Sequence, residues 1–173
     1  ACIEAIQNNT HLPVAKLAAK ALPQPSATDC YQLLHGLTEQ QAARGQWLCR
    51  YYSRALGTAL TVIDDATQCW SNDQVIALAR DAKFDELLTL LAPRFNNSVM
   101  VNDLLTDQPL AVVQRWLANP AMRQALITHA SPQHIVVHAN RLADANFDQQ
   151  VVLPALRRAA ADTEQQAGVA GHL

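Results

Sequence analysis

The chain contains 173 residues with a formal net charge of −2, and 50% of its residues are apolar while 16% are charged. This apolar content excludes an intrinsically disordered chain, and the length suits one domain with a buried core. The slightly acidic balance leaves no concentrated basic face, so we expect no nucleic-acid partner. No apolar run is long enough for a transmembrane segment, and residues 1–4 lack the pattern of a signal peptide. We therefore expect a soluble protein, cytoplasmic in preference to secreted.

The composition favours helices, because alanine is abundant and five glycines are few for a β-rich chain of this length. Proline and glycine end one expected helix after another, and Ser, Thr, Asn or Asp residues begin the next. The clearest expected helix starts at the capping box Thr38-x-x-Gln41 and runs from Glu39 to Leu56, before Gly57. In chain order, the expected helices span about residues 10–22, 26–36, 39–56, 58–70, 71–92, 99–105, 106–119, 120–129, 131–144 and 147 onward.

Short connections between these helices predict one all-α domain over residues 1–173, a compact irregular bundle of about nine helices with a flexible tail at 165–173. An alternative is a short α-solenoid of helical hairpins. It is suggested by the segment 81–85, Asp-Ala-Lys-Phe-Asp, which recurs at 144–148 as Asp-Ala-Asn-Phe-Asp. In each copy the phenylalanine would anchor the second helix of a hairpin. No further copy lies midway, so the bundle is the preferred prediction.

The four cysteines are Cys2, Cys30, Cys49 and Cys69, and none of them forms a Cys-x-x-Cys pair. A structural zinc site usually needs ligands in such closely spaced pairs, so we expect no zinc. Free and mostly buried thiols are the preferred prediction, since free cysteine behaves as a small hydrophobe. The alternative is two disulfides in a secreted protein, in which the Asn-x-Ser/Thr sequons at 8–10 and 96–98 would be glycosylation candidates.

The sequence lacks the residue patterns that are typical of catalytic, metal-binding or cofactor-binding sites. His134 and His138 share one face of an expected helix, but no acidic residue accompanies them as in a His-Glu-x-x-His zinc site, so they are expected to be solvated. The pair Asp64-Asp65 lacks the third acid that a magnesium-binding Asp-Asp-x-x-Asp motif requires. The sequence also has no nucleophile elbow, glycine-rich phosphate loop or dinucleotide fingerprint. We therefore expect no catalytic residue, no metal and no cofactor, and no enzymatic activity.

The most informative feature lies on the expected helix from Glu39 to Leu56. Its apolar stripe consists of Ala42, Gly45, Leu48, Cys49, Tyr52 and Leu56. Trp47, Arg50 and Arg54 fall on the opposite face, and Trp and Arg dominate the binding energy of protein interfaces. The alternative is that a second helix covers Trp47 while the arginines extend to its edge.

These patterns predict a non-catalytic protein-interaction domain, such as an adaptor, regulator or effector module. Its partner would be a protein that binds a helix face through Trp47, Arg50 and Arg54. The alternative function is that of a small helical enzyme or ligand-binding protein, in which polar groups from distant positions converge in a pocket between helices.

Overall fold

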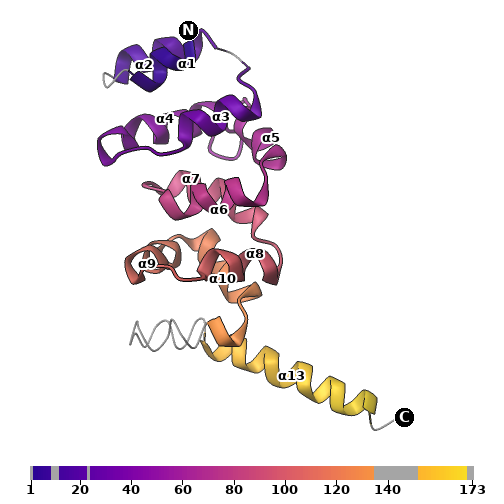
Figure 1. The fold of residues 1–173 in the computed structure, drawn as a ribbon. Helices are drawn as coiled ribbons and strands as arrows, with labels where there is room; N and C mark the ends of the chain where they lie inside the picture. Colours follow the sequence, from indigo (N-terminus) through magenta and orange to yellow (C-terminus); the bar gives the residue numbers. More distant parts are fainter. Residues whose placement is uncertain (1, 9–11, 23, 135–151, 171–173) are drawn as a thin grey trace. The chain divides into compact units, whose positions relative to one another are not determined.

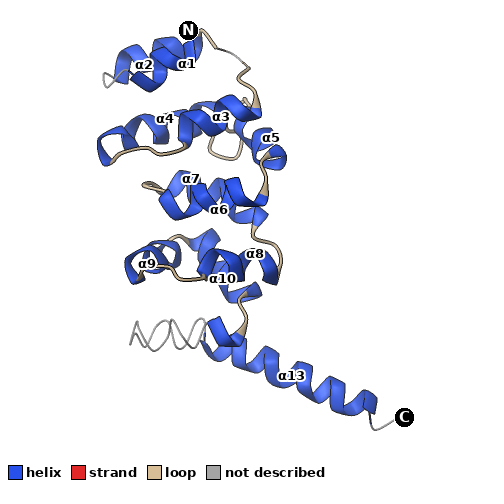
Figure 2. Cartoon of the chain, viewed as in Figure 1, coloured by secondary structure: helices blue, strands red, loops and turns tan. Residues whose placement is uncertain are grey.

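The computed structural model describes residues 2–8, 12–22, 24–134 and 152–170 (Figure 1). The all-α class is confirmed, because these residues form helices joined by loops and contain no strand (Figure 2). Contacts divide the chain into two compact units, residues 1–94 and residues 95–173. The expectation of a single domain stays a prediction.

Unit 1, residues 1–94, is built of short helices. They are α1 (Cys2–Asn8), α2 (Leu12–Lys20), α3 (Ala27–Leu34), the 3-10 helix η1 (Glu39–Gln41), α4 (Ala42–Tyr52), α5 (Val62–Cys69), α6 (Asn72–Asp81), α7 (Asp85–Leu91) and the 3-10 helix η2 (Ala92–Arg94). Within this unit α4 lies between α2 and α7 and contacts both, while α3 packs on α5 (Figure 1). The middle position of α4 means that its side chains are shared between two neighbouring layers of helices.

Local capping explains where several of these helices begin. The Ser26 hydroxyl accepts a hydrogen bond from the Asp29 amide at 3.1 Å, and the Asp29 carboxylate accepts one from the Ser26 amide at 3.0 Å. The same reciprocal pair joins Ser71 and Gln74 at the start of α6, with distances of 3.0 and 3.2 Å. Each box satisfies backbone amides that have no partner inside the helix, so both starts follow from the local sequence.

Other expected boundaries are wrong. The helix α1 was not expected at all. The helical segment expected over residues 71–92 forms two helices, with the break before Phe84 that the recurrent pattern at 81–85 indicated. Ala82 (φ −56°, ψ 127°) and Phe84 (φ −151°, ψ 151°) adopt non-helical backbone conformations there. The helix expected from residue 58 starts only at Val62, since Thr58 is engaged in a turn that ends α4.

Unit 2, residues 95–173, contains α8 (Ser98–Leu105), α9 (Leu110–Ala118), α10 (Pro120–His129) and α13 (Leu153–Ala170). The Asn119 side chain accepts a hydrogen bond from the Met122 amide at 3.0 Å and so caps α10. Around it, α10 contacts α8, α9 and α13, and Trp116 is fully buried. Pro154 lies in the first turn of α13, where its missing amide costs nothing. Since α13 reaches Ala170, part of the segment 165–173 is helical, and its expected flexibility stays a prediction.

The cysteines are free thiols, as the preferred prediction stated. Cys30 and Cys49 are buried, Cys2 is half-buried and Cys69 is exposed. Burial, with a smaller contribution from the charge of Asp29, raises the pKa of the Cys30 thiol to about 12. Burial also raises the pKa of Cys49 well above its usual value. Both buried thiols therefore remain protonated at neutral pH and are poor nucleophiles.

Among the helices whose residues the structure describes, none combines the length and the apolar character needed to cross a bilayer.

Candidate interaction surface on helix α4

The helix that carries the predicted binding residues is shorter than expected. It was expected to run from Glu39 to Leu56, but α4 ends at Tyr52. The Thr58 hydroxyl lies 2.9 Å from two backbone carbonyl oxygens at the end of the helix, and the Asp64 carboxylate accepts a hydrogen bond from the Arg54 amide at 2.8 Å. These contacts hold the chain in a turn, so Arg54 follows the helix and is not part of its face.

The buried face of α4 agrees with the predicted apolar stripe. Gly45, Leu48, Cys49 and Tyr52 are all buried. The Tyr52 hydroxyl lies 2.6 Å from the carbonyl oxygens of both Ala19 and Leu22, at the end of α2. A hydroxyl can donate to one of these carbonyls at a time, and either bond attaches α4 to α2.

A buried arginine on α4 fixes the helix to the start of the chain. Arg44 is 6% exposed, and its guanidinium donates hydrogen bonds to the carbonyl oxygens of Ile6 and Gln7 at 2.7 and 2.8 Å. Both carbonyls belong to the last turn of α1, where the helix itself supplies no donor. The role of Arg44 could not be predicted from the sequence, because its partners lie 38 and 37 residues away in the chain.

Trp47 lies at the outer edge of α4 and is half-buried. Its ring stacks on that of Tyr51, one turn further along, with ring centroids 4.7 Å apart and an interplanar angle of 13°. The Lys16 ammonium of α2 lies 5.5 Å from the centroid of the Trp47 ring, within cation–π range. The neighbouring helix therefore contributes a cation to the tryptophan but does not bury it.

Arg50 extends from α4 toward α7. The Arg50 guanidinium lies 2.5 Å from a carboxylate oxygen of Glu86. The Arg50 side chain is 60% exposed, whereas the Glu86 side chain is only 12% exposed. The same oxygen accepts a hydrogen bond from the Gln46 amide at 2.8 Å. Partial burial on its own would raise the pKa of Glu86. The hydrogen bonds from Gln46, the Glu86 backbone and Arg50, together with the charge of Arg50, have the larger combined effect, so the pKa of Glu86 is lowered.

The structure thus brings Trp47 and Arg50 together with Lys16 and Tyr51, which sequence analysis did not assign to the site. We call the set Lys16, Trp47, Arg50, Tyr51 and Arg54 the α4 surface. The spacing of Trp47 and Tyr51, four residues apart on one helix, was the signal that could have identified the second ring.

The weaker candidates have structural roles or lie outside the described residues. The Asp64 carboxylate is bound by the turn after α4, and the Asp65 carboxylate accepts a hydrogen bond from the Thr61 hydroxyl at 3.1 Å. His134 lies 2.8 Å from the Ser131 hydroxyl, while His138 is outside the described residues, as is the segment 144–148. No cluster of three or more potential metal ligands occurs within the described ranges.

Acrylamide quenching of tryptophan fluorescence is expected to report mainly on Trp47. Trp70 and Trp116 are only 3% and 0% exposed, so acrylamide reaches their rings poorly. Replacing Trp47 by phenylalanine should remove most of the quenchable emission, and Trp116→Phe should leave the quenched fraction unchanged or larger. An unchanged Stern–Volmer slope in Trp47→Phe would show that Trp47 is shielded and that the α4 surface is not accessible.

The Glu86 carboxylate is expected to make stability depend on pH. The pKa of Glu86 in the folded state lies below the ordinary value of 4.5. The carboxylate therefore adds to the free energy of unfolding above about pH 4.5, and this stabilisation is lost as pH falls through the folded-state pKa. Urea unfolding of wild type and Glu86→Gln at roughly pH 3 to 7 should show a wild-type advantage near neutral pH that shrinks on acidification. A constant difference across this range would contradict the assignment.

Comparisons with known proteins assign no function to this surface. No protein-family model matches the sequence, and neither a curated protein nor a solved structure matches it. Function has to be inferred from the residues and contacts of the surface itself.

Proposed function

We propose that this protein is a non-catalytic protein-interaction domain whose partner binds the α4 surface. The observation that carries the proposal is the state of Trp47, which is ordered by stacking on Tyr51 yet remains partly open to solvent. The other two tryptophans are buried in the cores of their units. A large aromatic ring left at an edge, next to arginine, has the composition of a binding hot spot.

The way α4 is held supports the same proposal. The helix is attached to α1 by Arg44, to α2 by Tyr52 and to α7 through Arg50 and Glu86. The rings of the surface are therefore in position before a partner arrives. A partner that binds a prearranged surface loses less conformational entropy, which leaves more of the contact energy as affinity.

Site-specific photo-crosslinking tests this proposal. A benzoylphenylalanine is introduced at exposed Ala43, one turn before Trp47 on α4, in one variant, and at exposed Gln68 on α5 in a control variant. Irradiation in an extract of the native cells should give a discrete crosslinked protein from position 43 and not from position 68. Adding Trp47→Ala to the first variant should abolish that product while the helical circular dichroism signal is retained. Identical products from both positions, or a product unaffected by Trp47→Ala, would overturn the proposal.

A further inference from the structure

Four cations, Lys16, Lys20, Arg50 and Arg54, lie on or beside the α4 surface, and the carboxylates of Glu86 and Asp64 lie next to Arg50 and to the Arg54 backbone. Arg50 is paired with Glu86, but Lys16, Lys20 and the Arg54 guanidinium form no ion pair within the described part of the chain. Lys20 is exposed on α2 one turn beyond Lys16, so both ammonium groups follow the same side of that helix. The side of α2 next to α4 and the turn after α4 therefore carry cations without an ion pair, although the net charge of the chain is −2.

Trp47 adds an unused hydrogen-bond donor to these charges. The indole N–H of Trp70 donates to the Ala27 carbonyl oxygen at 2.8 Å, as expected for a buried tryptophan. The indole N–H of Trp47 has no protein acceptor among the residues that the structure describes. A carboxylate fits this group, because it only accepts hydrogen bonds and is attracted by the surrounding cations.

From this combination we infer that the partner presents an acidic peptide segment to the α4 surface, with carboxylates near the cations and an apolar side chain against the two rings. The inference rests on the proposed function and adds the chemistry of the partner. A nucleic acid is also anionic, but Tyr51 already occupies a face of the Trp47 ring that a base would need for stacking.

The test uses fluorescence anisotropy with three labelled probes of equal length. These are a peptide of Glu, Asp, Leu and Tyr, the same peptide with lysine in place of every acid, and a single-stranded oligonucleotide. The acidic peptide should bind the full chain and weaken as salt is added, because exposed charges are screened. Trp47→Ala should weaken binding by roughly tenfold or more, as at interface hot spots. The double variant Lys16→Glu/Arg54→Glu should weaken it by at least about tenfold through charge repulsion.

A charge-matched control separates the surface from net charge. Arg157 is exposed on α13 in the other unit, and Arg157→Glu should leave binding within about twofold of wild type. Preference for the lysine peptide or the oligonucleotide would overturn the inference, as would equal loss in Arg157→Glu or no binding of the acidic peptide at all. A crosslink from position 43 to a non-acidic segment would overturn this inference and leave the proposed function standing. Failure of the crosslinking itself would overturn both.

Discussion

Replacing Arg44 by methionine is expected to lower the free energy of unfolding by about 3 kcal/mol. Methionine fills a similar volume but provides no donor to the Ile6 and Gln7 carbonyl oxygens that Arg44 binds at 2.7 and 2.8 Å. Hydrogen bonds from a charged donor contribute roughly 1.5–3 kcal/mol each, and a buried carbonyl without a donor is costly. Burial lowers the pKa of the Arg44 guanidinium, which nevertheless stays protonated at neutral pH.

The effect should be largest in α1. This helix has 7 residues, too few to be stable without tertiary contacts. Hydrogen exchange in Arg44→Met should therefore accelerate over residues 2–8 before it changes elsewhere. Lys20→Met provides the control, because it removes an exposed ammonium and should change the urea midpoint little. If Arg44→Met showed wild-type hydrogen-exchange rates over α1 and an unchanged urea midpoint, the hydrogen bonds from the Arg44 guanidinium to the two carbonyl oxygens would not stabilise α1.

The position of Arg44 illustrates what the sequence could not predict. The all-α class and the buried stripe of α4 follow from composition and from the helical period, which are local properties. The partners of Arg44 are distant in the chain, and no local pattern marks an arginine that caps another helix. The same limit explains Arg54, which continues the helical spacing of Trp47 and Arg50 but is held in a turn by Asp64 from α5.

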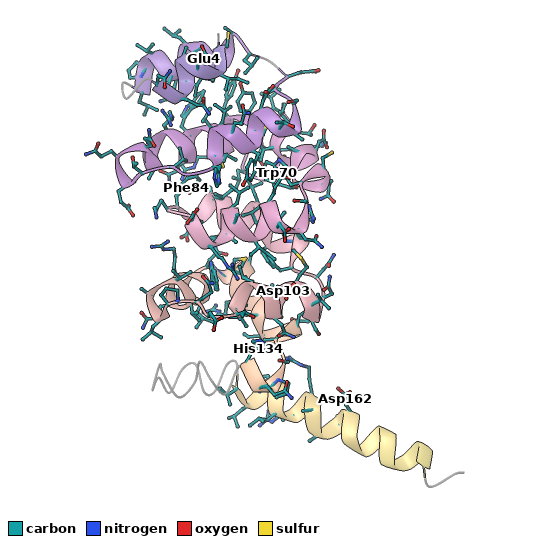
Figure 3. All side chains as sticks on the ribbon, in the orientation of Figure 1. Glu4, Trp70, Phe84, Asp103, His134 and Asp162 are labelled. Atoms are coloured by element: carbon teal, nitrogen blue, oxygen red, sulfur yellow. The ribbon has the colours of Figure 1, made fainter. Side chains whose placement is uncertain are left out.

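The break between α6 and α7 was indicated by the recurrent pattern around Phe84, but not by helical propensity. The residues Ala82, Lys83 and Phe84 contain neither glycine nor proline, so helical propensity alone favours one continuous helix. The backbone turns there because Phe84 packs against α4 (Figure 3). The recurrent Asp-x-x-Phe-Asp pattern did single out this phenylalanine as an anchor, but it gave no indication of which helix receives it.

Gly45 is the residue of α4 that receives Phe84, and Gly45→Val is expected to lower the free energy of unfolding by about 2 kcal/mol. A Cβ atom at position 45 would lie 2.7 and 2.9 Å from Cε1 and Cζ of the Phe84 ring, and closer still to the Leu37 side chain. Such distances are below van der Waals contact, so the Phe84 and Leu37 side chains, or the segments that carry them, have to shift. Valine is a better helix former than glycine, but this gain is only a few tenths of a kcal/mol.

A double-mutant cycle with Phe84→Leu separates the steric clash from the change in helix propensity. Leucine is smaller than phenylalanine, so the cost of Gly45→Val should fall by at least about 1 kcal/mol in the Phe84→Leu background. Glu86 lies two residues beyond Phe84, so a shift of α7 in response to Gly45→Val would also move the Glu86 carboxylate away from Arg50. The loss of stability that Glu86→Gln causes at neutral pH should therefore be smaller in the Gly45→Val background than in the wild-type background. Additive effects in both cycles would mean that Gly45 and Phe84 do not set the spacing of α4 and α7, and that the ion pair at the edge of the α4 surface forms independently of this contact.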